Sequence, residues 1–546
     1  MPGLAAAGPS PGGPAPAGHC TGPSTGPTTG PSTEPSIGRA LLATVLDHAR
    51  RRPDHPALSD DRCALTYADL ADEVAATAAA LAREGVGPGA TMVVALPNCA
   101  HFVVSALAGL WLGAAFVPVS ADDPAARRAG IVADSGAAHV VSATGDDTTA
   151  LAVQPLAGGR PAGRARPLRS GGTPPPPVTD PGLDAYLLYT SGTTGTPKGV
   201  RVGERALRVA VVCSARAMGL GPATRSLCVS PFHFDGSFGT AFSTLVAGGS
   251  LVIPPREELL YLRRFFRALH DDGITHTGFS PSFLHLVLSS PASAGLATSH
   301  LRTLGLGGEE CVPADLRRLW EIRPSLRVFN RYGPTETTVE VTTSEITPGD
   351  LETGRIPVGR PHPGTTFVLH DEGSGIVEGP GVPGQLYIGG EQLMRGYWGD
   401  PDLTREVLRT DVVPGTVLYR TGDRMVRDAE GRYVYLGRVD DVVKRKGVRI
   451  SLRELARALE GVEGVGRAVC QTVPHGAGVR IVAYAEGADP TTPAGVLKAL
   501  RTRLPPTMLP DEVRVVEALP LSSTGKVGRA PSAPGGPGPG LLPGPP

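Results

Sequence analysis

The sequence lacks the features of several protein classes. Its 52 basic and 52 acidic residues leave no net charge, which argues against a non-specific nucleic-acid binder with a basic stripe. Its seven cysteines are scattered, with no C-x-x-C pair, so neither a disulfide framework nor a zinc knuckle is indicated. No run of about 18 apolar residues predicts a membrane span, and the N-terminus lacks a signal peptide's basic-then-apolar order. We therefore expect a soluble cytoplasmic protein that binds neither nucleic acid nor a membrane.

Aromatic residues are also scarce, at 5%, whereas the 72 glycines and 55 prolines gather in three places. Residues 1–36 are nearly all Pro, Gly, Ala, Ser and Thr, and cannot bury enough apolar surface to offset chain entropy. The sequence therefore predicts a disordered leader (1–36), a surface excursion at Gly158–Gly182 and a disordered tail (530–546).

Strand and helix patterns alternate between these segments. Leu41–Arg51 and Tyr67–Arg83 have helical spacing, whereas Thr91–Leu96 and Ala114–Val119 have the pattern of buried strands. This alternation predicts an α/β fold with largely parallel sheets. At 546 residues the chain exceeds one typical domain, and its composition changes near Gly437–Asp441, where a smaller charged α/β segment begins.

The stretch Leu187–Val200, LLYTSGTTGTPKGV, has a composition that ordinary packing does not require. Its glycines let backbone N–H groups turn inward and its hydroxyls add donors, so the loop can form an anion-binding concavity. Lys198 adds a point charge suited to phosphate. A Walker A loop is excluded, because Lys198 follows Pro197 and precedes Gly199. A flexible solvated linker is the alternative interpretation.

This string resembles the phosphate loop of the adenylate-forming superfamily, which includes nonribosomal peptide adenylation domains, acyl-CoA synthetases and firefly luciferase. Eight further stretches resemble core motifs of that family, in the family's order, from about residue 37 to 529. They are Leu65–Leu70 (LTYADL), Leu112–Val119 (LGAAFVPV), Asn330–Thr337 (NRYGPTET), Gly384–Trp398 (GQLYIGGEQLMRGYW), Tyr419–Asp423 (YRTGD), Gly437–Ile450 (GRVDDVVKRKGVRI), Leu504–Pro510 (LPPTMLP) and Leu519–Arg529 (LPLSSTGKVGR). The chain is thus identified as resembling a free-standing amino acid adenylation domain of the nonribosomal peptide synthetase type.

The resemblance implies two folded domains and one reaction. Residues 37–439 would form the core domain, with two mainly parallel sheets packed with helices and a β-barrel-like part. Residues 440–529 would form a small mobile α+β domain. The reaction would join a carboxylate to the α-phosphate of ATP and release pyrophosphate, with Mg²⁺ as cofactor.

On the family's pattern, one group of residues would bind the nucleotide. Glu336 would coordinate Mg²⁺, Tyr332 would stack on adenine, and Asp423 would accept hydrogen bonds from the ribose hydroxyls. Arg438 would support ribose or phosphate, and Lys198 would act on the phosphates. The phosphate loop itself would comprise Thr190, Ser191, Gly192, Thr193, Thr194 and Gly195.

Lys526 is the residue that the resemblance makes the main catalytic group. It would bridge the substrate carboxylate and the α-phosphate, and so stabilise charge that rearranges in the transition state. Asp440 would be the hinge about which the small domain rotates after adenylation. Read alone, Lys526 is an exposed turn lysine and Asp440 lies in a solvated turn; the flanking motifs decide between the interpretations.

Asp235 indicates which kind of acid is activated. In amino-acid-activating members, the aspartate at this place pairs with the substrate ammonium, because a buried cation needs a partner. A stray loop aspartate is the alternative. Motif offsets give the remaining pocket positions as Gly236, Gly239, Gly278, Gly305, Gly307, Arg331, Val339 and Glu340.

So many glycines predict a roomy pocket and a long or bulky substrate side chain. Arg331 and Glu340 either pair with each other, leaving a neutral polar pocket, or one of them meets a charged substrate. We expect a polar or charged amino acid, without a choice of sign.

One position departs from the family's pattern, since Glu204 stands where many relatives carry a histidine, which puts phosphate-side contacts there in doubt. No carrier motif follows Lys526 and no condensation motif precedes the domain. The expected partner is therefore a separate peptidyl or acyl carrier protein bearing phosphopantetheine, approached through Arg445–Gly447 and Arg449. The resemblance also allows for a small MbtH-like activator protein.

Two other functions stay open. An acyl-CoA or aryl-CoA ligase would share every motif, and only Asp235 argues against it. A non-catalytic scaffold could retain the fold, although the intact Lys526, Glu336 and Asp423 argue against it.

Overall fold

A computed structural model describes most of the chain between residues 40 and 519. The described residues are 40–120, 125–144, 147–157, 160–161, 166–167, 173–190, 197–255, 259, 262–439, 442–445, 448–475, 478–487, 492–502, 504 and 509–519. The predicted leader and tail, five loop residues (191–195), Asp440 and Lys526 lie outside them.

The helices cover and separate the sheets. Their bounds are α1 (Leu41–Arg51), α2 (Tyr67–Arg83), α3 (Ala100–Leu112), α4 (Ala125–Asp134), α5 (Glu204–Met218), α6 (Asp235–Val246), α8 (Leu262–Asp271), α9 (Pro281–Ser289), α10 (Gly295–Thr298), α11 (Pro313–Ile322), α12 (Pro401–Val407), α13 (Leu452–Glu460) and α14 (Pro493–Arg501), with short 3₁₀ turns η1 (Pro291–Ala294), η2 (Thr335–Thr337) and η3 (Pro348–Leu351). The helices α1 and α2 have the predicted bounds.

The first sheet is parallel in its centre. Its spatial order is β16 (Thr342–Ile346), β15 (Arg327–Tyr332), β14 (Thr303–Gly307), β13 (His276–Phe279), β11 (Arg225–Cys228), β12 (Ser250–Val252), β1 (Pro56–Ser59) and β2 (Ala64–Thr66). Pairing is parallel from β15 to β1 and antiparallel at the β16 and β2 edges.

The second sheet has the same mixed character. Its order is β21 (Gly396–Tyr397), β10 (Lys198–Gly203), β9 (Asp184–Thr190), β4 (Ala115–Pro118), β3 (Thr91–Ala95), β5 (His139–Thr144), β6 (Asp147–Ala157) and β7 (Arg160–Pro161), with β8 (Arg166–Pro167) beside β6. The strands predicted at 91–96 and 114–119 are β3 and β4, which pair in parallel.

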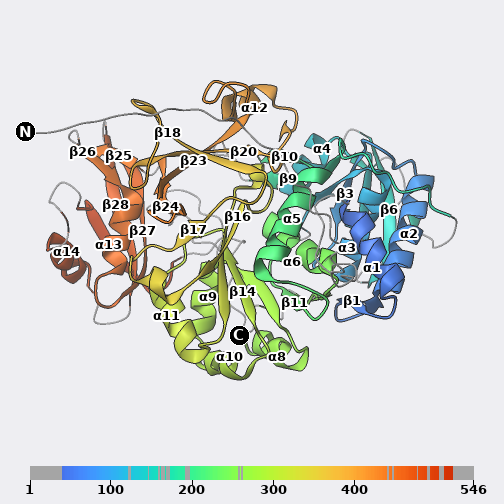
Figure 1. Ribbon diagram of the computed structural model, residues 1–546, viewed down its shortest axis with the longest axis horizontal. Helices are drawn as coiled ribbons and strands as arrows, with labels where there is room; N and C mark the ends of the chain where they lie inside the picture. The colour runs from blue at the N-terminus through green and yellow to red at the C-terminus, as the bar shows by residue number, and fades with distance from the viewer. Residues whose placement is uncertain are drawn as a thin grey trace, which may run out of the picture. The chain divides into compact units, whose positions relative to one another are not determined.

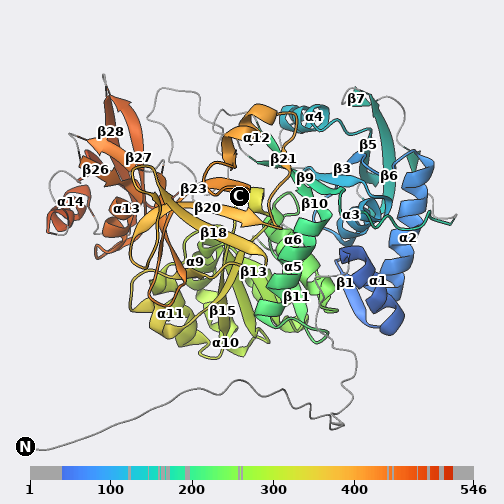
Figure 2. The same cartoon turned by 45° about the horizontal axis from the view of Figure 1, so that its top comes forward.

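A third sheet is antiparallel and, among the described residues, open rather than closed into a barrel. Its order is β17 (Pro357–Gly359), β24 (Tyr433–Arg438), β23 (Leu418–Arg427), β20 (Pro383–Gly390), β18 (Thr365–Asp371) and β19 (Gly375–Ile376), with β22 (Leu408–Arg409) beside β23. Figure 2 shows its strands β18, β20 and β23 side by side, and its edge strand β17 contacts β15 and β16 of the first sheet.

The remaining strands follow the predicted domain boundary. They are β25 (Val442–Arg445) and β26 (Val448–Ser451), and a three-stranded sheet of β27 (Val465–His475), β28 (Gly478–Gly487) and β29 (Glu512–Val516). With α13 and α14 they surround an apolar cluster that includes Leu455, Ile481 and Leu500. The mixed α/β class is confirmed, and the domain boundaries themselves stay predictions.

The helices α5 and α6 pack against each other and separate the first two sheets (Figure 1). Here α5 contacts β9 and β10, whereas α6 contacts β11, β12 and β13. Buried aromatic rings fill the junction, including Phe116 of β4, Tyr186 of β9 and Phe238 of α6. One apolar core therefore fixes α6 between the sheets, and α6 begins at Asp235.

Local sequence explains why the first core motif is structural. Thr66 caps α2, its hydroxyl accepting from the Asp69 N–H while the Asp69 carboxylate accepts from the Thr66 N–H. This reciprocal capping box satisfies two donors that a helix start otherwise leaves unpaired. The buried hydroxyl of Tyr67 donates toward the carbonyls of Leu245, in the last turn of α6, and of Gly249, just after the helix. LTYADL thus holds the outer helix against the central one.

Candidate active site

The carboxyl end of β15 brings two groups of site residues together. Arg331 and Tyr332 are neighbours on the strand, so their side chains face opposite sides. Arg331 lies over glycines of the first sheet and α6, whereas Tyr332 contacts Asp423 of β23. In open α/β sheets, ligands bind at such strand ends.

The residues expected at adenine and ribose form one cluster. The Tyr332 hydroxyl donates to Oδ2 of Asp423 at 2.5 Å, and Nη1 of Arg438 lies 3.3 Å from Oδ1 of the same carboxylate. Asp423 and Arg438 face each other in the register of β23 and β24. Burial, together with the nearby Asp423 carboxylate, raises the pKa of the Tyr332 phenol, which therefore stays protonated and donates.

Glu336 and Lys198 are linked through a residue that the sequence analysis did not single out. The Tyr397 hydroxyl donates to Oε1 of Glu336 at 2.7 Å, and the Lys198 ammonium lies 5.4 Å from the centre of the Tyr397 ring. Burial and the Glu336 carboxylate raise the pKa of the Tyr397 phenol. The antiparallel pairing of β10 with β21 brings Tyr397 beside Lys198. Tyr397 lies in the quoted motif GGEQLMRGYW, which is the signal that could have identified it.

The described residues include the strand that precedes the phosphate loop, β9, and the strand that follows it, β10. Thr190 and Lys198 are directly paired in the register of β9 and β10, so the segment between them leaves and returns at one edge of the second sheet. The loop's predicted phosphate contacts, the hinge role of Asp440 and the catalytic role of Lys526 stay predictions.

Asp235 lies in the first turn of α6, next to a buried tyrosine. Burial and the Asp235 charge raise the pKa of the Tyr186 phenol. A Cβ at the next residue, Gly236, would meet no atom within 4 Å. Open space therefore lies directly after the carboxylate expected to hold the substrate ammonium.

The other pocket glycines do not leave room for substrate, and this corrects the interpretation of a roomy pocket. A Cβ at Gly239 would lie 2.1 Å from Nη2 of Arg331, one at Gly278 would lie 2.8 Å from Nη1, and one at Gly305 would lie 2.8 Å from Cδ. A Cβ at Gly307 would lie 2.8 Å from the Arg331 carbonyl oxygen. These glycines accommodate the arginine of the chain itself.

Of the alternatives left open for Arg331 and Glu340, the structure has the two paired. Nη2 of Arg331 lies 2.5 Å from Oε2 of Glu340, and both side chains are buried, with 7% and 5% of their surface exposed. Because both side chains are buried, the charges of the pair are shielded from water.

An unusual turn presents Glu340. Thr338 and Val339 both have φ of 62°, a left-handed conformation that costs β-branched residues energy. Gln392 holds this turn, donating from Nε2 to the Glu340 carbonyl at 2.7 Å, while its own carbonyl accepts from the Thr338 hydroxyl at 2.8 Å. Gln392 lies in the same motif as Tyr397, but its supporting role depends on tertiary contact and has no local signal.

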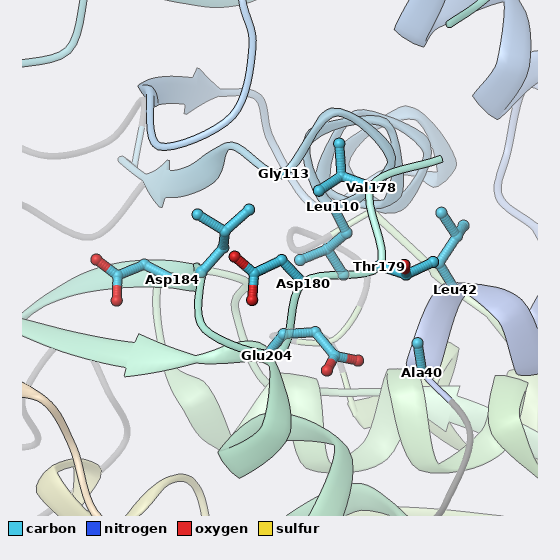
Figure 3. A pocket seen from close by; sticks show the side chains of 10 residues that line it. Ala40, Leu42, Leu110, Gly113, Val178, Thr179, Asp180, Asp184 and Glu204 are labelled. Atoms are coloured by element: carbon cyan, nitrogen blue, oxygen red, sulfur yellow. The ribbon is translucent and has the colours of Figure 1, made fainter. Parts of the chain in front are cut away.

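Glu204 does not lie on the phosphate side. It follows β10 at the opposite end from Lys198, roughly 17 Å away for a strand of this length. Its Oε1 accepts from the Leu41 N–H at 2.9 Å, so it anchors the start of α1. Figure 3 shows it beside a small pocket that Asp180, Asp184 and Leu110 also line. Among the described residues, Glu204 thus contacts the start of α1 and not the Lys198 end of β10.

The residues present fit the cofactor that the family implies. Among the described residues, no group of three His, Cys, Asp or Glu side chains could enclose a metal ion. Mg²⁺ in nucleotide sites is typically held by one or two carboxylates together with phosphates, so a single carboxylate such as that of Glu336 would be enough on the protein side. In the part of the chain that the structure describes, no helix is both long and apolar enough to cross a bilayer.

Comparison with known proteins identifies the family. A family model described as "AMP-binding enzyme" matches residues 45–398, and the chain therefore belongs to the AMP-binding enzyme family. Its class is that of the AMP-forming ligases, which use ATP and Mg²⁺.

Two relatives show the likeness beyond the family model. Phenyloxazoline synthase MbtB of Mycobacterium sp. (strain MCS) is 34% identical over 486 residues, covering 88% of this chain and 40% of that protein. Enterobactin synthase component F of Escherichia coli (strain K12) is 32% identical over 517 residues, covering 90% of this chain and 39% of that protein. The chain thus spans about two fifths of the length of these relatives.

Solved structures share the fold. Klebsiella oxytoca NpsA, in complex with 3-hydroxyanthranilyl-AMSN, has a TM-score of 0.77 at 23% identity, covering 90% of this chain and 98% of that one. Holo-AB3403, a four-domain nonribosomal peptide synthetase bound to AMP and glycine, has a TM-score of 0.75 at 27% identity, covering 91% of this chain and 36% of that one.

Proposed function

We propose that this protein activates an amino acid with ATP, forming an aminoacyl-adenylate and pyrophosphate, and passes the aminoacyl group to the phosphopantetheine thiol of a carrier protein. One observation carries the proposal. At the end of β15, Tyr332 contacts Asp423 on one side of the strand, whereas Arg331 lies toward α6, the helix of Asp235, on the other. We assign the nucleotide to the first side and an acyl pocket to the second. A carboxylate held in that pocket would lie beside the nucleotide, as adenylation requires.

In the first step, a carboxylate oxygen of the amino acid attacks the α-phosphorus of ATP. A new O–P bond forms, the bond to the β-phosphate oxygen breaks, and pyrophosphate leaves with the electron pair. In the acyl pocket, Asp235 would hold the substrate ammonium. At the nucleotide, Asp423 would accept from ribose hydroxyls and Glu336 would hold Mg²⁺, which when bound offsets the charge of the phosphates. Lys526 would neutralise charge that develops between the carboxylate and the α-phosphate.

In the second step, the carrier thiolate attacks the carbonyl carbon of the adenylate. The thioester bond forms, the bond to the phosphate oxygen breaks, and AMP leaves. We propose Asp440 as the hinge between the two steps, and a stand-alone carrier with an MbtH-like activator as the partners to test.

Amino-acid-dependent exchange of pyrophosphate into ATP tests the first step. We expect exchange with one or a few amino acids, and its loss in Asp235→Ala because the substrate ammonium loses its partner. Asp72→Ala, which removes an exposed carboxylate of α2, is the control and should keep wild-type exchange.

Absence of exchange with every amino acid would refute the proposal. Formation of a CoA thioester from an acid without an amino group would support the ligase alternative instead. No ATP use with any acid would support the scaffold alternative.

A further inference from the structure

The inner end of the acyl pocket is a polar surface. Along one face of the first sheet, Gly278 of β13 pairs with Gly305 of β14, and Gly307 pairs with Arg331 of β15. Because these glycines put no side chains on the sheet face, the Arg331 side chain can lie flat across it toward Gly239 of α6. The guanidinium therefore forms the floor of the pocket, one helical turn after Asp235.

The ion pair on this floor is only partly satisfied. Arg331 and Glu340 share one hydrogen bond, from Nη2 to Oε2. Among the residues that the structure describes, Nε of Arg331 and Oε1 of Glu340 are buried and have no hydrogen-bond partner. Native proteins leave few buried polar atoms unpaired, because each unpaired atom loses its hydration without compensation. One donor and one acceptor are thus left for a ligand.

Two neutral groups adjoin the pair and leave hydrogen-bonding capacity of their own. The Thr240 hydroxyl and Nη1 of Arg331 both lie within 3.0 Å of the point where a Cβ of residue 278 would be, and the hydroxyl has no partner within the described part of the chain. His276 lies two residues before Gly278, on the same strand face, with Nδ1 bonded to the Thr303 hydroxyl. Burial and the Arg331 charge lower the pKa of His276 to about 3, so it is uncharged.

The charges on this floor cancel. Arg331 carries one positive charge and Glu340 one negative charge. A substrate side chain with its own charge would be buried without a counter-charge, and an apolar side chain would leave the free donor and acceptor unpaired. A matching side chain is neutral and carries both an acceptor and a donor.

We infer that the pocket selects an amino acid with a primary carboxamide side chain, whose carbonyl accepts from Arg331 and whose NH₂ donates to Glu340. This inference rests on the proposed function and names its substrate class. The amide offers one oxygen acceptor and two N–H donors on neighbouring atoms. Four residues of α6, about 6 Å along the helix axis, separate the Asp235 and Gly239 positions, so asparagine fits better than glutamine.

Pyrophosphate exchange with matched substrates tests the inference. Asparagine, aspartate and leucine have nearly the same shape and differ in charge and polarity, and 2,4-diaminobutyrate adds a cation. We expect kcat/KM for asparagine, or for glutamine, to exceed that for the other three by at least about 100-fold, as when buried polar groups are left unpaired by the wrong substrate. A preference for aspartate, leucine or diaminobutyrate overturns the inference but leaves the proposed function standing. Exchange with no amino acid at all refutes the proposed function itself.

Two variants distinguish recognition from a merely structural role. Glu340→Gln leaves the Arg331 charge unbalanced, so the ratio of kcat/KM for aspartate to that for asparagine should rise by at least about tenfold. Arg331→Met leaves the Glu340 charge unbalanced, so the ratio for diaminobutyrate to asparagine should rise similarly. A structural role alone would lower all rates together and leave both ratios unchanged, which would overturn the inference.

The matched control is another ion pair, which joins the strands β15 and β16. Glu345 of β16 and Arg327 of β15 form an exposed ion pair at 2.7 Å, far from the bare glycine face at the other end of β15. Glu345→Gln makes the same chemical change as Glu340→Gln and should leave every ratio within about twofold of wild type. Should a pocket variant fail to fold, the wild-type substrate panel still decides the inference.

Discussion

The hydroxyl of Tyr397 donates to the carboxylate of Glu336 at 2.7 Å, although 61 residues separate them in the chain. The same ring lies beneath the ammonium of Lys198. One tyrosine thus orients the carboxylate proposed to hold Mg²⁺ and packs against the lysine proposed to act on phosphate.

Removal of this hydroxyl should weaken catalysis without unfolding the protein. Hydrogen bonds to charged groups contribute about 1.5–3 kcal/mol, so Tyr397→Phe should lower kcat/KM for ATP by roughly 10- to 150-fold. The Mg²⁺ concentration for half-maximal exchange should rise as well. Tyr433→Phe, which changes a partly buried ring of the third sheet outside the site, is the control. Equal activity of the two variants would show that the Tyr397 contact plays no part.

Asp423 can be tested against the ribose hydroxyls directly. For the wild type, 2′-deoxy-ATP and 3′-deoxy-ATP should show which hydroxyl contributes, by a loss of about 10- to 150-fold in kcat/KM. Asp423→Asn should lose a similar factor with ATP, but little more with the deoxy analogue, because the interaction is already gone. Asp428→Asn, at a carboxylate that pairs with Arg432 at 2.8 Å in the same region, should keep full discrimination. If the loss from Asp423→Asn and the loss from the deoxy analogue add in full, Asp423 does not bind the ribose hydroxyl.

Gly236 and Gly239 of α6 should respond in opposite ways to substitution by alanine. Gly239→Ala places a methyl group against Arg331 and should cost about 1–3 kcal/mol of unfolding free energy. Gly236→Ala meets open space and should stabilise the helix by about 0.5–1 kcal/mol. Urea unfolding measures both. If the space beside Gly236 takes the substrate, this variant also raises KM for the amino acid while KM for ATP stays unchanged; an unchanged KM for both would exclude substrate from that space.

His276 makes stability depend on pH. Its pKa is lowered from 6.5 to about 3 on folding, so between these values the unfolded state binds more protons than the native state. Stability is therefore lost as pH falls from 6.5 toward 3, by up to about 1.4 kcal/mol per pH unit for this one group. His276→Gln should reduce the slope of the unfolding free energy against pH by about that amount. The remaining slope has contributions from His48 and His362, whose pKa values burial also lowers.

The control for this experiment is His300→Gln, which changes an exposed histidine. It should leave the pH slope as in the wild type. Identical slopes for wild type and His276→Gln would show that His276 is protonated or accessible in the native protein.

Local patterns predicted the elements better than the pocket. The bounds of α1 and α2 followed from apolar spacing, because this signal repeats within one or two turns of chain. The motifs also named Tyr332 and Asp423, which the structure brings into contact across 91 residues. Motif offsets supply such pairs because each residue keeps its place on its own strand.

The meaning of the pocket glycines could not be predicted in the same way. A bare glycine can make room for a ligand or for another side chain, and only the path of Arg331 across β13 and β14 decides between the two. The position of Glu204 has a similar cause, since its partner is the backbone of Leu41, 163 residues away. Contacts of this kind depend on how distant elements pack, which no local spacing records.

The mutual neutralisation of Arg331 and Glu340 restricts how this enzyme could acquire a new substrate. A change in either codon alone leaves a buried charge without its partner, so intermediates on an evolutionary path would be poorly active with old and new substrates alike. A single change shifts the preference but lowers the activity, so efficient descendants with a new substrate should differ at both positions, and laboratory evolution would need to mutate the two codons together.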